Sequence, residues 1–292
     1  MIPQTIHFIW LSEEPLNQVA RDCIDTWKRR APEFEIRRWS LSDFDIRAMP
    51  PFVGEAIAAR KWAFACDYLR LWVLYNHGGW YLDSDVVLFR SPIRYAQCRY
   101  VTAFEWSPDL FQTELVDEDG RAKVDFVNGM GLQSAIQGCE PAHEFIRDCM
   151  QWYEGRHFAL PDGGFGGMLA PHIQALVARK YGFKYKPEQQ FLAHGMVVLD
   201  PRIFATSVMY LSNESEMLHM CNGSWRESWE RLITVEEVER RLQDDQFAEQ
   251  TREQCLRREL MNLKQSESYR LGLVLTAPLR LLWRLLRRGG CC

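Results

Sequence analysis

The sequence lacks paired-cysteine motifs, although it contains nine cysteines among 292 residues. No two cysteines stand in CxxC spacing, the number is odd, and several, such as Cys66 and Cys149, lie in apolar runs. These features argue against a disulfide framework and against a zinc site built from spaced cysteine pairs. They indicate a protein that works in a reducing compartment.

Signal-like segments and internal repeats are also lacking. The chain begins with Met-Ile-Pro and enters the apolar segment TIHFIW at once, without the pattern of a secretory signal or an N-terminal membrane anchor. No repeat or low-complexity linker occurs. We therefore expect a cytoplasmic location.

The chain also lacks an excess of basic residues outside its C-terminal segment. The net charge is −4, and residues 269–292 contain five arginines and no acidic residue, so the rest of the chain is more acidic than the total. Proteins that bind nucleic acid need a basic surface, and this balance predicts no nucleic-acid partner. The basic C-terminal segment is suited to an anionic surface.

Strand and helix patterns alternate along the chain. The best-defined helix is residues 61–77, whose apolar positions recur at helical spacing and which Gly78-Gly79 should end. Strands are expected at 5–10, 34–39 and 80–89 and near 99–104, 124–128 and 183–187. Further helices are expected at 16–30 and 52–60 and near 141–153 and 167–181. This alternation predicts an α/β fold with a mostly parallel sheet covered by helices, in which ligands bind at the carboxyl ends of strands.

One of three Asp-x-Asp pairs stands in an unusual context. The pairs of residues 43/45 and 117/119 fall in turn-like or solvated segments, whereas Asp83 and Asp85 are set inside the apolar run WYLDSDVVLF. Carboxylates in such a run are costly to bury without a partner, and a divalent cation is one efficient partner. On a strand, residues i and i+2 face the same side, so both carboxylates should address one ion. Two exposed acids on an edge strand or turn are the alternative.

The residues around this pair carry a family resemblance. The run ACDYLR at 65–70, followed by GGWYLDSDV at 78–86, resembles the glycosyltransferases whose sugar-binding region carries the Asp-x-Asp motif. The opening segment IPQTIHFIWL resembles their first strand, and the closing LDPRIFAT, then His219 and Gly223-Ser224-Trp225, resemble their final strand and loop. The resemblance extends over about residues 1–230. It implies a GT-A fold, a nucleotide-sugar donor, usually UDP-linked, Mn²⁺ (or Mg²⁺) on the diphosphate, and transfer with retention.

The resemblance also assigns residues to the donor. Asp67 and Arg70, three residues apart on one helix face, would contact hydroxyls of the donor sugar. Trp10 would pack on the nucleotide base, with Ile9 as its backbone neighbour. An intrahelical ion pair is the alternative for Asp67 and Arg70, and a core position is the alternative for Trp10.

The metal site and the diphosphate site follow from the same resemblance. Asp83, Asp85 and His219 would hold the ion, and the hydroxyl of Ser224 and the indole N–H of Trp225 would donate to phosphate oxygens. A neutral imidazole suits Mn²⁺ better than Mg²⁺. His219 in a structural role and Trp225 in simple packing are the alternatives.

The C-terminal part divides into two further segments. Residues 231–268 are charged and predict exposed helices, whereas 269–292 include PLRLLWRLLRR, which predicts a basic amphipathic helix lying in a membrane interface. A C-terminal helix that docks on the protein body or mediates dimerisation is the alternative. We expect a retaining hexosyltransferase that acts on a glycan or lipid-linked glycan, peripheral on the inner face of a bacterial plasma membrane, with Asp67, Arg70 and Asp85 essential for catalysis and UDP-galactose slightly favoured.

Two other classes of protein remain open at this point. A haloacid-dehalogenase-type phosphohydrolase would use Asp83 and Asp85 as its nucleophile motif, but its later acidic pair could only be Asp244-Asp245 in a charged helical stretch. A non-catalytic partner with the GT-A fold would not need the intact set of acidic residues. The identity of the sugar, the acceptor and the linkage is not encoded in any recognisable motif.

Overall fold

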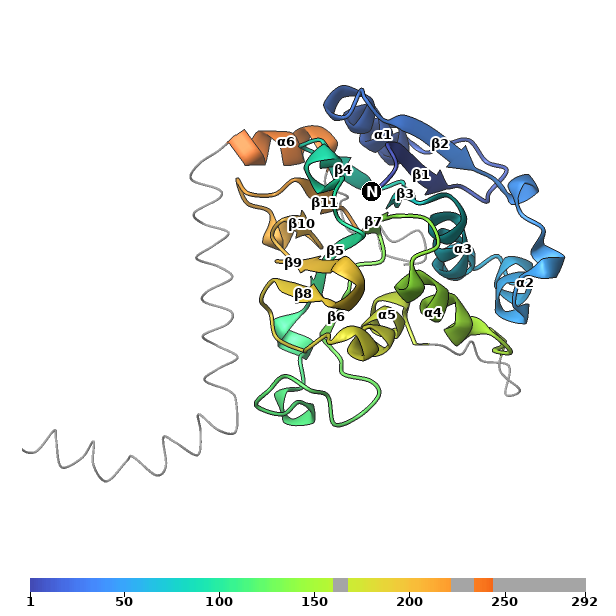
Figure 1. The fold of residues 1–292 in the computed structure, drawn as a ribbon. Coiled ribbons are helices and arrows are strands. Elements are labelled where there is room, and N and C mark those ends of the chain that lie inside the picture. Colours follow the sequence, from blue (N-terminus) through green and yellow to red (C-terminus); the bar gives the residue numbers. More distant parts are fainter. Residues whose placement is uncertain (160–167, 222–233, 244–292) are drawn as a thin grey trace, which may run out of the picture.

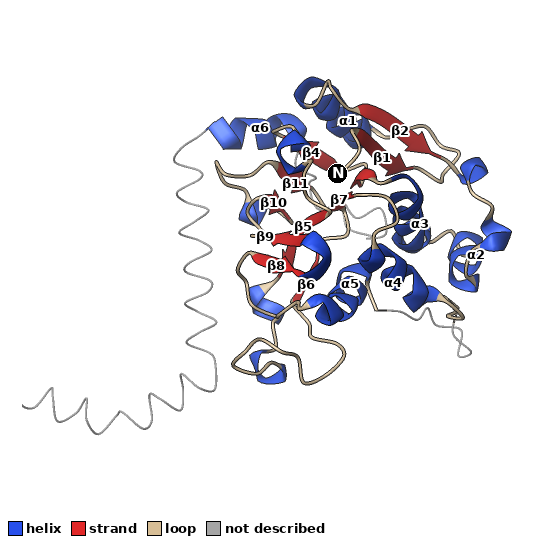
Figure 2. Ribbon diagram, in the orientation of Figure 1, coloured by secondary structure: helices blue, strands red, loops and turns tan. Residues whose placement is uncertain are grey.

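The computed structural model describes residues 1–159, 168–221 and 234–243. They form a central sheet with helices against it and a smaller sheet at one side (Figures 1 and 2). The helices are α1 (Gln18–Arg30), α2 (Pro51–Ala58), α3 (Trp62–His77), α4 (Glu144–Tyr153), α5 (Ala170–Ala178) and α6 (Val235–Gln243).

The central sheet has eight strands in the order β2-β1-β3-β7-β5-β9-β8, with β6 paired to β5. Its strands are β1 (Thr5–Ile9), β2 (Glu35–Trp39), β3 (Gly79–Leu82), β5 (Tyr100–Trp106), β6 (Met130–Leu132), β7 (Ile136–Cys139), β8 (Gln190–Leu192) and β9 (Met196–Leu199). The strand pairings give β1, β2, β3, β5 and β9 one common direction. The expected α/β class with a mostly parallel sheet is confirmed.

Two hydrophobic cores cover the two faces of this sheet. Helices α2, α3, α4 and α5 contribute to one core, and α1 contributes to the other. Alternation along a strand explains the division: in β3, Tyr81 belongs to the first core, and Trp80 and Leu82 belong to the second. Both faces are apolar, which is why β3 is completely buried.

The smaller sheet has three strands in the order β10-β11-β4, with bounds Phe204–Ala205, Met217–His219 and Val86–Leu88. Helix α1 is tied to it by two buried hydrogen bonds. The indole N–H of Trp27 donates to the carbonyl of Val86 (2.7 Å), and the hydroxyl of Thr26 accepts from the N–H of Leu88 (2.9 Å). These bonds fix β4 beside the central sheet.

The turn between α3 and β3 depends on its two glycines. Gly78 and Gly79 have φ values of +64° and +89°, a region that side chains rarely allow. A Cβ atom on Gly79 would also lie 2.7 Å from the carbonyl oxygen of Thr5. The helix therefore ends where the sequence predicted, and the chain enters β3 directly beside β1.

The expectation of one strand over 80–89 is wrong. The chain forms β3, then a turn at 83–85, then β4, and these two strands belong to different sheets. The N–H of Val86 donates to the carbonyl of Asp83 (3.0 Å), which closes the turn. The two polar aspartates interrupt the apolar run at the point where the chain changes sheets.

Two of the expected short strands do not form, near 124–128 and 183–187. Phe183 and Tyr185 are buried in strand-like alternation, but no strand within residues 1–159, 168–221 and 234–243 pairs with them. The side-chain amide of Gln190 instead bonds both the N–H and the carbonyl of Lys184 (3.0 and 2.7 Å). An alternating pattern thus shows which side chains are buried, but a strand also needs a neighbouring strand.

Beyond Cys221, the structure describes only residues 234–243, which include α6. Val235 and Val238 are buried, and Glu239 forms an ion pair with Arg29 of α1 (3.1 Å). The remainder of 231–268 and the whole of 269–292 lie outside the described residues. Among the described helices, none has the length and hydrophobicity needed to cross a membrane.

A buried histidine joins the first strands of the sheet. Nδ1 of His7 accepts from the indole N–H of Trp39 (3.1 Å), and Nε2 lies 3.1 Å from the carbonyl of Gly78. These partners require a neutral ring with its proton on Nε2. Burial, together with His77 and Arg37, lowers the pKa of His7 to about 4.

We predict that His7 makes the fold acid-sensitive. Because its pKa is about 4 in the folded chain and 6.5 in the unfolded chain, its contribution is complete above pH 6.5 and is lost as the pH falls towards 4. The full difference corresponds to roughly 3 kcal/mol. Urea unfolding of the wild type and of His7→Asn between pH 7 and pH 4.5 measures it. The wild type should lose more stability than the variant over this range, and equal losses would contradict the assignment.

Candidate active site

Polar side chains gather at one edge of the central sheet. Strands β1, β3 and β5 run in the same direction, so their carboxyl ends meet there. Trp10 follows β1, Asp83 follows β3, and Glu105 lies near the end of β5. This is the edge at which open α/β sheets bind ligands.

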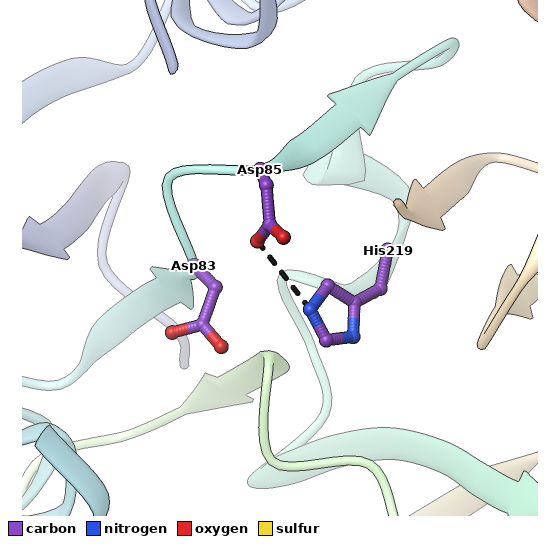
Figure 3. Close-up of side chains that lie close together, drawn as sticks. All are labelled: Asp83, Asp85 and His219. Carbon is purple, nitrogen blue, oxygen red and sulfur yellow. Dashed lines mark ion pairs between the residues drawn. The ribbon is translucent and has the colours of Figure 1, made fainter. Parts of the chain in front are cut away.

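Asp83, Asp85 and His219 converge beside this edge (Figure 3). One ligand atom from each lies within 4.8 Å of the others, and all three side chains are partly exposed. Nε2 of His219 is 3.4 Å from Oδ1 of Asp85. The structure thus brings together the three residues that the family resemblance assigned to the metal.

The smaller sheet positions two of these groups. Asp85 immediately precedes β4 and His219 ends β11, and because these strands are antiparallel, both residues lie at the same edge. The N–H of Met220 donates to the carbonyl of Asp85 (3.0 Å), which fixes the two backbones together. Both carboxylates therefore point to the same place because they lie in a turn between two sheets. The sequence had predicted the same convergence from alternation along a single strand.

Arg70 lies between the carboxylates of α3 and of the turn. Its guanidinium is 3.1 Å from Oδ1 of Asp67 and 3.5 Å from Oδ2 of Asp83, and only 5% of its side chain is exposed. Its Nε donates to the carbonyl of Cys66 (3.1 Å), and its Cζ is 5.0 Å from the ring centre of Tyr81. The intrahelical ion pair, which was the alternative interpretation of these two residues, is therefore present, and it extends to the first aspartate of the motif.

The charges in this group are unequal. Burial, together with Asp83 and Glu105, raises the pKa of Asp67 to about 7 against the attraction of Arg70. Burial alone would lower the pKa of Arg70, but Asp83 and its other neighbours raise it, so the guanidinium stays charged. The Arg70 guanidinium thus pairs with two carboxylates at once, and a bound metal cation would neutralise more of their negative charge.

His219 is held towards its charged form by two neighbouring side chains. Burial disfavours a charged imidazole, but Cys221 and the Asp85 carboxylate outweigh burial and hold the pKa of His219 well above its usual range. A metal-binding imidazole must give up this proton, so an ion and a proton compete for the position.

This donor set fits a divalent ion. Two carboxylates suit Mn²⁺ and Mg²⁺ alike, and the imidazole nitrogen favours Mn²⁺ of the two. The nearby Asp67 and Arg70 add an acceptor and a donor that are able to bind sugar hydroxyls.

The residues assigned to the nucleotide have different positions. Ile9 is buried in the core, so only its backbone is available to a ligand. Trp10 is partly exposed, and its indole N–H donates to the carbonyl of Glu14 (2.8 Å), which holds the ring at the end of β1. Ser224 and Trp225 lie outside the described residues.

Sequence reasoning missed two side chains of the site. The hydroxyl of Tyr81 donates to Oδ1 of Asp83 (2.8 Å) and orients that carboxylate. Burial raises the pKa of Glu105, while His219 and Arg70 oppose the rise, which places its carboxylate in the same charged group. An acidic residue at the end of an apolar strand was the available signal for Glu105.

Comparison with known proteins finds a family match over part of the chain. Residues 18–105 match the model of the family described as "glycosyltransferase sugar-binding region containing DXD motif". The matched segment contains Asp67, Arg70, Asp83 and Asp85. No match is found among curated proteins.

Several solved glycosyltransferase structures are distantly similar. PaToxG glycosyltransferase shares 16% identity over 61% of this chain and 69% of its own, with a TM-score of 0.42. A glycosyltransferase involved in glycosylation of the major capsid of PBCV-1 shares 12% over 82% and 98%, with a TM-score of 0.41. Galactosyltransferase LgtC, solved with donor and acceptor sugar analogues, shares 13% over 84% and 95%, with a TM-score of 0.43.

The family match over residues 18–105 supports a glycosyltransferase, and this segment contains both aspartates of the Asp-x-Asp centre. The segment resembles the DXD-containing sugar-binding region, so the family resemblance predicted from the sequence is confirmed. The phosphohydrolase alternative is not favoured, and the acidic pair it would need, Asp244-Asp245, lies outside the described residues.

We predict that Arg70 is required for stability as well as for the site. Arg70→Met should lower the free energy of unfolding by roughly 3–5 kcal/mol, because the carboxylates that it neutralises stay in place. The exposed Arg38 of β2 provides the control, and Arg38→Met should change stability by less than about 0.5 kcal/mol. Urea denaturation at neutral pH compares the two. Equal effects of both substitutions would show that the ion group around Arg70 contributes nothing.

Proposed function

We propose that this chain is a metal-dependent GT-A hexosyltransferase that uses Asp83, Asp85 and His219 to hold Mn²⁺ (or Mg²⁺) and the diphosphate of a nucleotide sugar. The observation that carries the proposal is the convergence of these three side chains from two sheets. Convergent ligands of this kind at the carboxyl edge of a sheet match what a sugar diphosphate needs.

The chemistry follows from where negative charge develops. Breaking the sugar–phosphate bond leaves charge on the diphosphate, and a bound divalent ion supplies Lewis-acid stabilisation to it. Tyr81 and Arg70 hold the Asp83 carboxylate from two directions, so its ligand atom is oriented before substrate arrives. Ser224 and Trp225 are proposed to donate hydrogen bonds to the same diphosphate.

The donor is proposed to be a UDP-hexose, with UDP-galactose favoured slightly over UDP-glucose. Asp67 and Arg70 support recognition of the sugar, because they sit one helical turn apart beside Asp83 with Asp67 partly exposed. Trp10 at the end of β1 supports recognition of the base by stacking. Transfer with retention is proposed from the family resemblance, and no enzymic nucleophile is assigned.

The acceptor is proposed to be a glycan or a lipid-linked glycan. The support is the composition of residues 269–292, whose arginines and leucines suit an anionic membrane interface. The three-part division of the chain at about 230 and 268, and a place on the inner face of a bacterial plasma membrane, belong to the same proposal.

We predict that the ion is indispensable. EDTA should abolish transfer and Mn²⁺ should restore it better than Mg²⁺, whereas Asp85→Ala should lower kcat/KM by at least roughly 100-fold at any metal concentration. The chain contains a matched control in the exposed Asp119, which belongs to another Asp-x-Asp pair. Asp119→Ala should retain normal activity. Full activity of Asp85→Ala in metal-free buffer would refute the metal site.

We predict that Asp67 binds the sugar of the donor and not its nucleotide. Asp67→Asn should reduce kcat/KM for UDP-hexoses by roughly 100-fold while changing the Kd of free UDP by only about two- to threefold. Asp25 of α1 forms an exposed i,i+3 pair with Lys28, so Asp25→Asn is the matched control and should change neither value. Calorimetry with UDP and steady-state kinetics separate the two effects. Loss of UDP affinity with unchanged preference among sugars would contradict this role.

A further inference from the structure

The far side of the His219 ring carries a contact that the sugar-binding motif does not include. Nε2 of His219 faces Asp85, and Nδ1 lies 3.4 Å from Sγ of Cys221. The same sulfur lies 3.1 Å from the carbonyl oxygen of Thr206. Cys221 is exposed, unlike the other cysteines in the described part of the chain.

The direction of these hydrogen bonds is fixed by the carbonyl. A carbonyl oxygen only accepts, so the S–H of Cys221 must point to Thr206. The sulfur is then an acceptor towards His219, and Nδ1 must carry the proton. In a neutral ring this leaves the lone pair on Nε2, which faces Asp85.

The backbone is arranged to hold the thiol there. Cys221 has a φ of +51°, which is uncommon for a residue other than glycine. Thr206 directly follows β10, and β10 is parallel to β11, so Thr206 and His219 lie at the same edge of the smaller sheet. Asp85, His219 and Thr206 thus lie at the ends of the three strands of one small sheet, and Cys221 connects the last two.

We propose that Cys221 is a positioning residue that sets the tautomer and orientation of His219 for metal binding. This inference rests on the proposed metal site. Without the thiol, the neutral ring is free to place its proton on Nε2, donate to Asp85 and withdraw the lone pair that the ion needs. Groups that orient a metal-binding histidine typically change metal affinity by roughly 10–100-fold.

The test measures Mn²⁺ affinity directly, by electron paramagnetic resonance of the free ion, in full-length protein without donor. Cys221→Gly removes the thiol and suits the positive φ, so folding is preserved. It should weaken Mn²⁺ binding by roughly tenfold or more. Mg²⁺, which relies on the carboxylates, should lose less affinity, so the preference for Mn²⁺ should narrow.

Two further variants complete the design. Cys221→Ser keeps a group that both donates and accepts, and it should recover most of the Mn²⁺ affinity and preference that Cys221→Gly loses. Cys98 is a partly buried cysteine that packs against the hydrophobic core to which α1 contributes. The Cys98→Ser variant should bind Mn²⁺ like the wild type.

The outcomes separate the two proposals. Wild-type affinity and ion preference in Cys221→Gly would overturn the role of Cys221 while leaving the metal site intact. Equal losses in Cys221→Gly and Cys221→Ser would also overturn it, because a backbone effect and not the hydrogen-bond chain would be responsible. Failure of the wild type to bind Mn²⁺ at all would overturn the metal site and this inference together.

Discussion

The whole site depends on keeping several carboxylates close together at the edge of an apolar sheet. Arg70 contacts both Asp67 and Asp83, and Asp83 and Asp85 approach each other in the cluster with His219. Like charges at these distances repel strongly where water is partly excluded. An excess of negative charge favours the uptake of protons, and neighbouring carboxylates contribute in this way to the raised pKa values of Asp67 and His219. A divalent ion would relieve the same imbalance without a proton, and this links the fold to the proposed chemistry.

The architecture meets this constraint by drawing the charged groups from separate elements. Helix α3 supplies Asp67 and Arg70, the turn after β3 supplies Asp83 and Asp85, and β11 supplies His219. Each of these elements also packs into a hydrophobic cluster away from the site. This apolar packing opposes the repulsion between the carboxylates. The glycine turn at 78–79 lets β3 lie directly beside β1. The hydrogen bonds from α1 to β4 fix the smaller sheet beside the central sheet.

The sequence was sufficient for the elements whose signal is local. Helix α3, its end at Gly78 and the strand β1 follow from periodicity and glycine, and the Asp-x-Asp pair stands out because it interrupts an apolar run. The strands β6 to β9 and β11 were not predicted, because each spans only three or four residues and the strands of the sheet depend on partners elsewhere in the chain. The same limit explains why the turn at 83–85 was mistaken for a strand. Glu105 and Cys221 were overlooked because each acquires its neighbours only when strands from distant parts of the sequence meet.

The central claim is that Asp83, Asp85 and His219 bind one divalent ion together. A crystal structure of the protein with Mn²⁺ and UDP, recorded at the manganese absorption edge, tests it most directly. The account predicts one anomalous peak within bonding distance of a carboxylate oxygen of Asp83, a carboxylate oxygen of Asp85 and Nε2 of His219, with UDP phosphate oxygens completing the shell. An ion bound elsewhere, or bound UDP with His219 still paired to Asp85 and no anomalous peak between them, would contradict it.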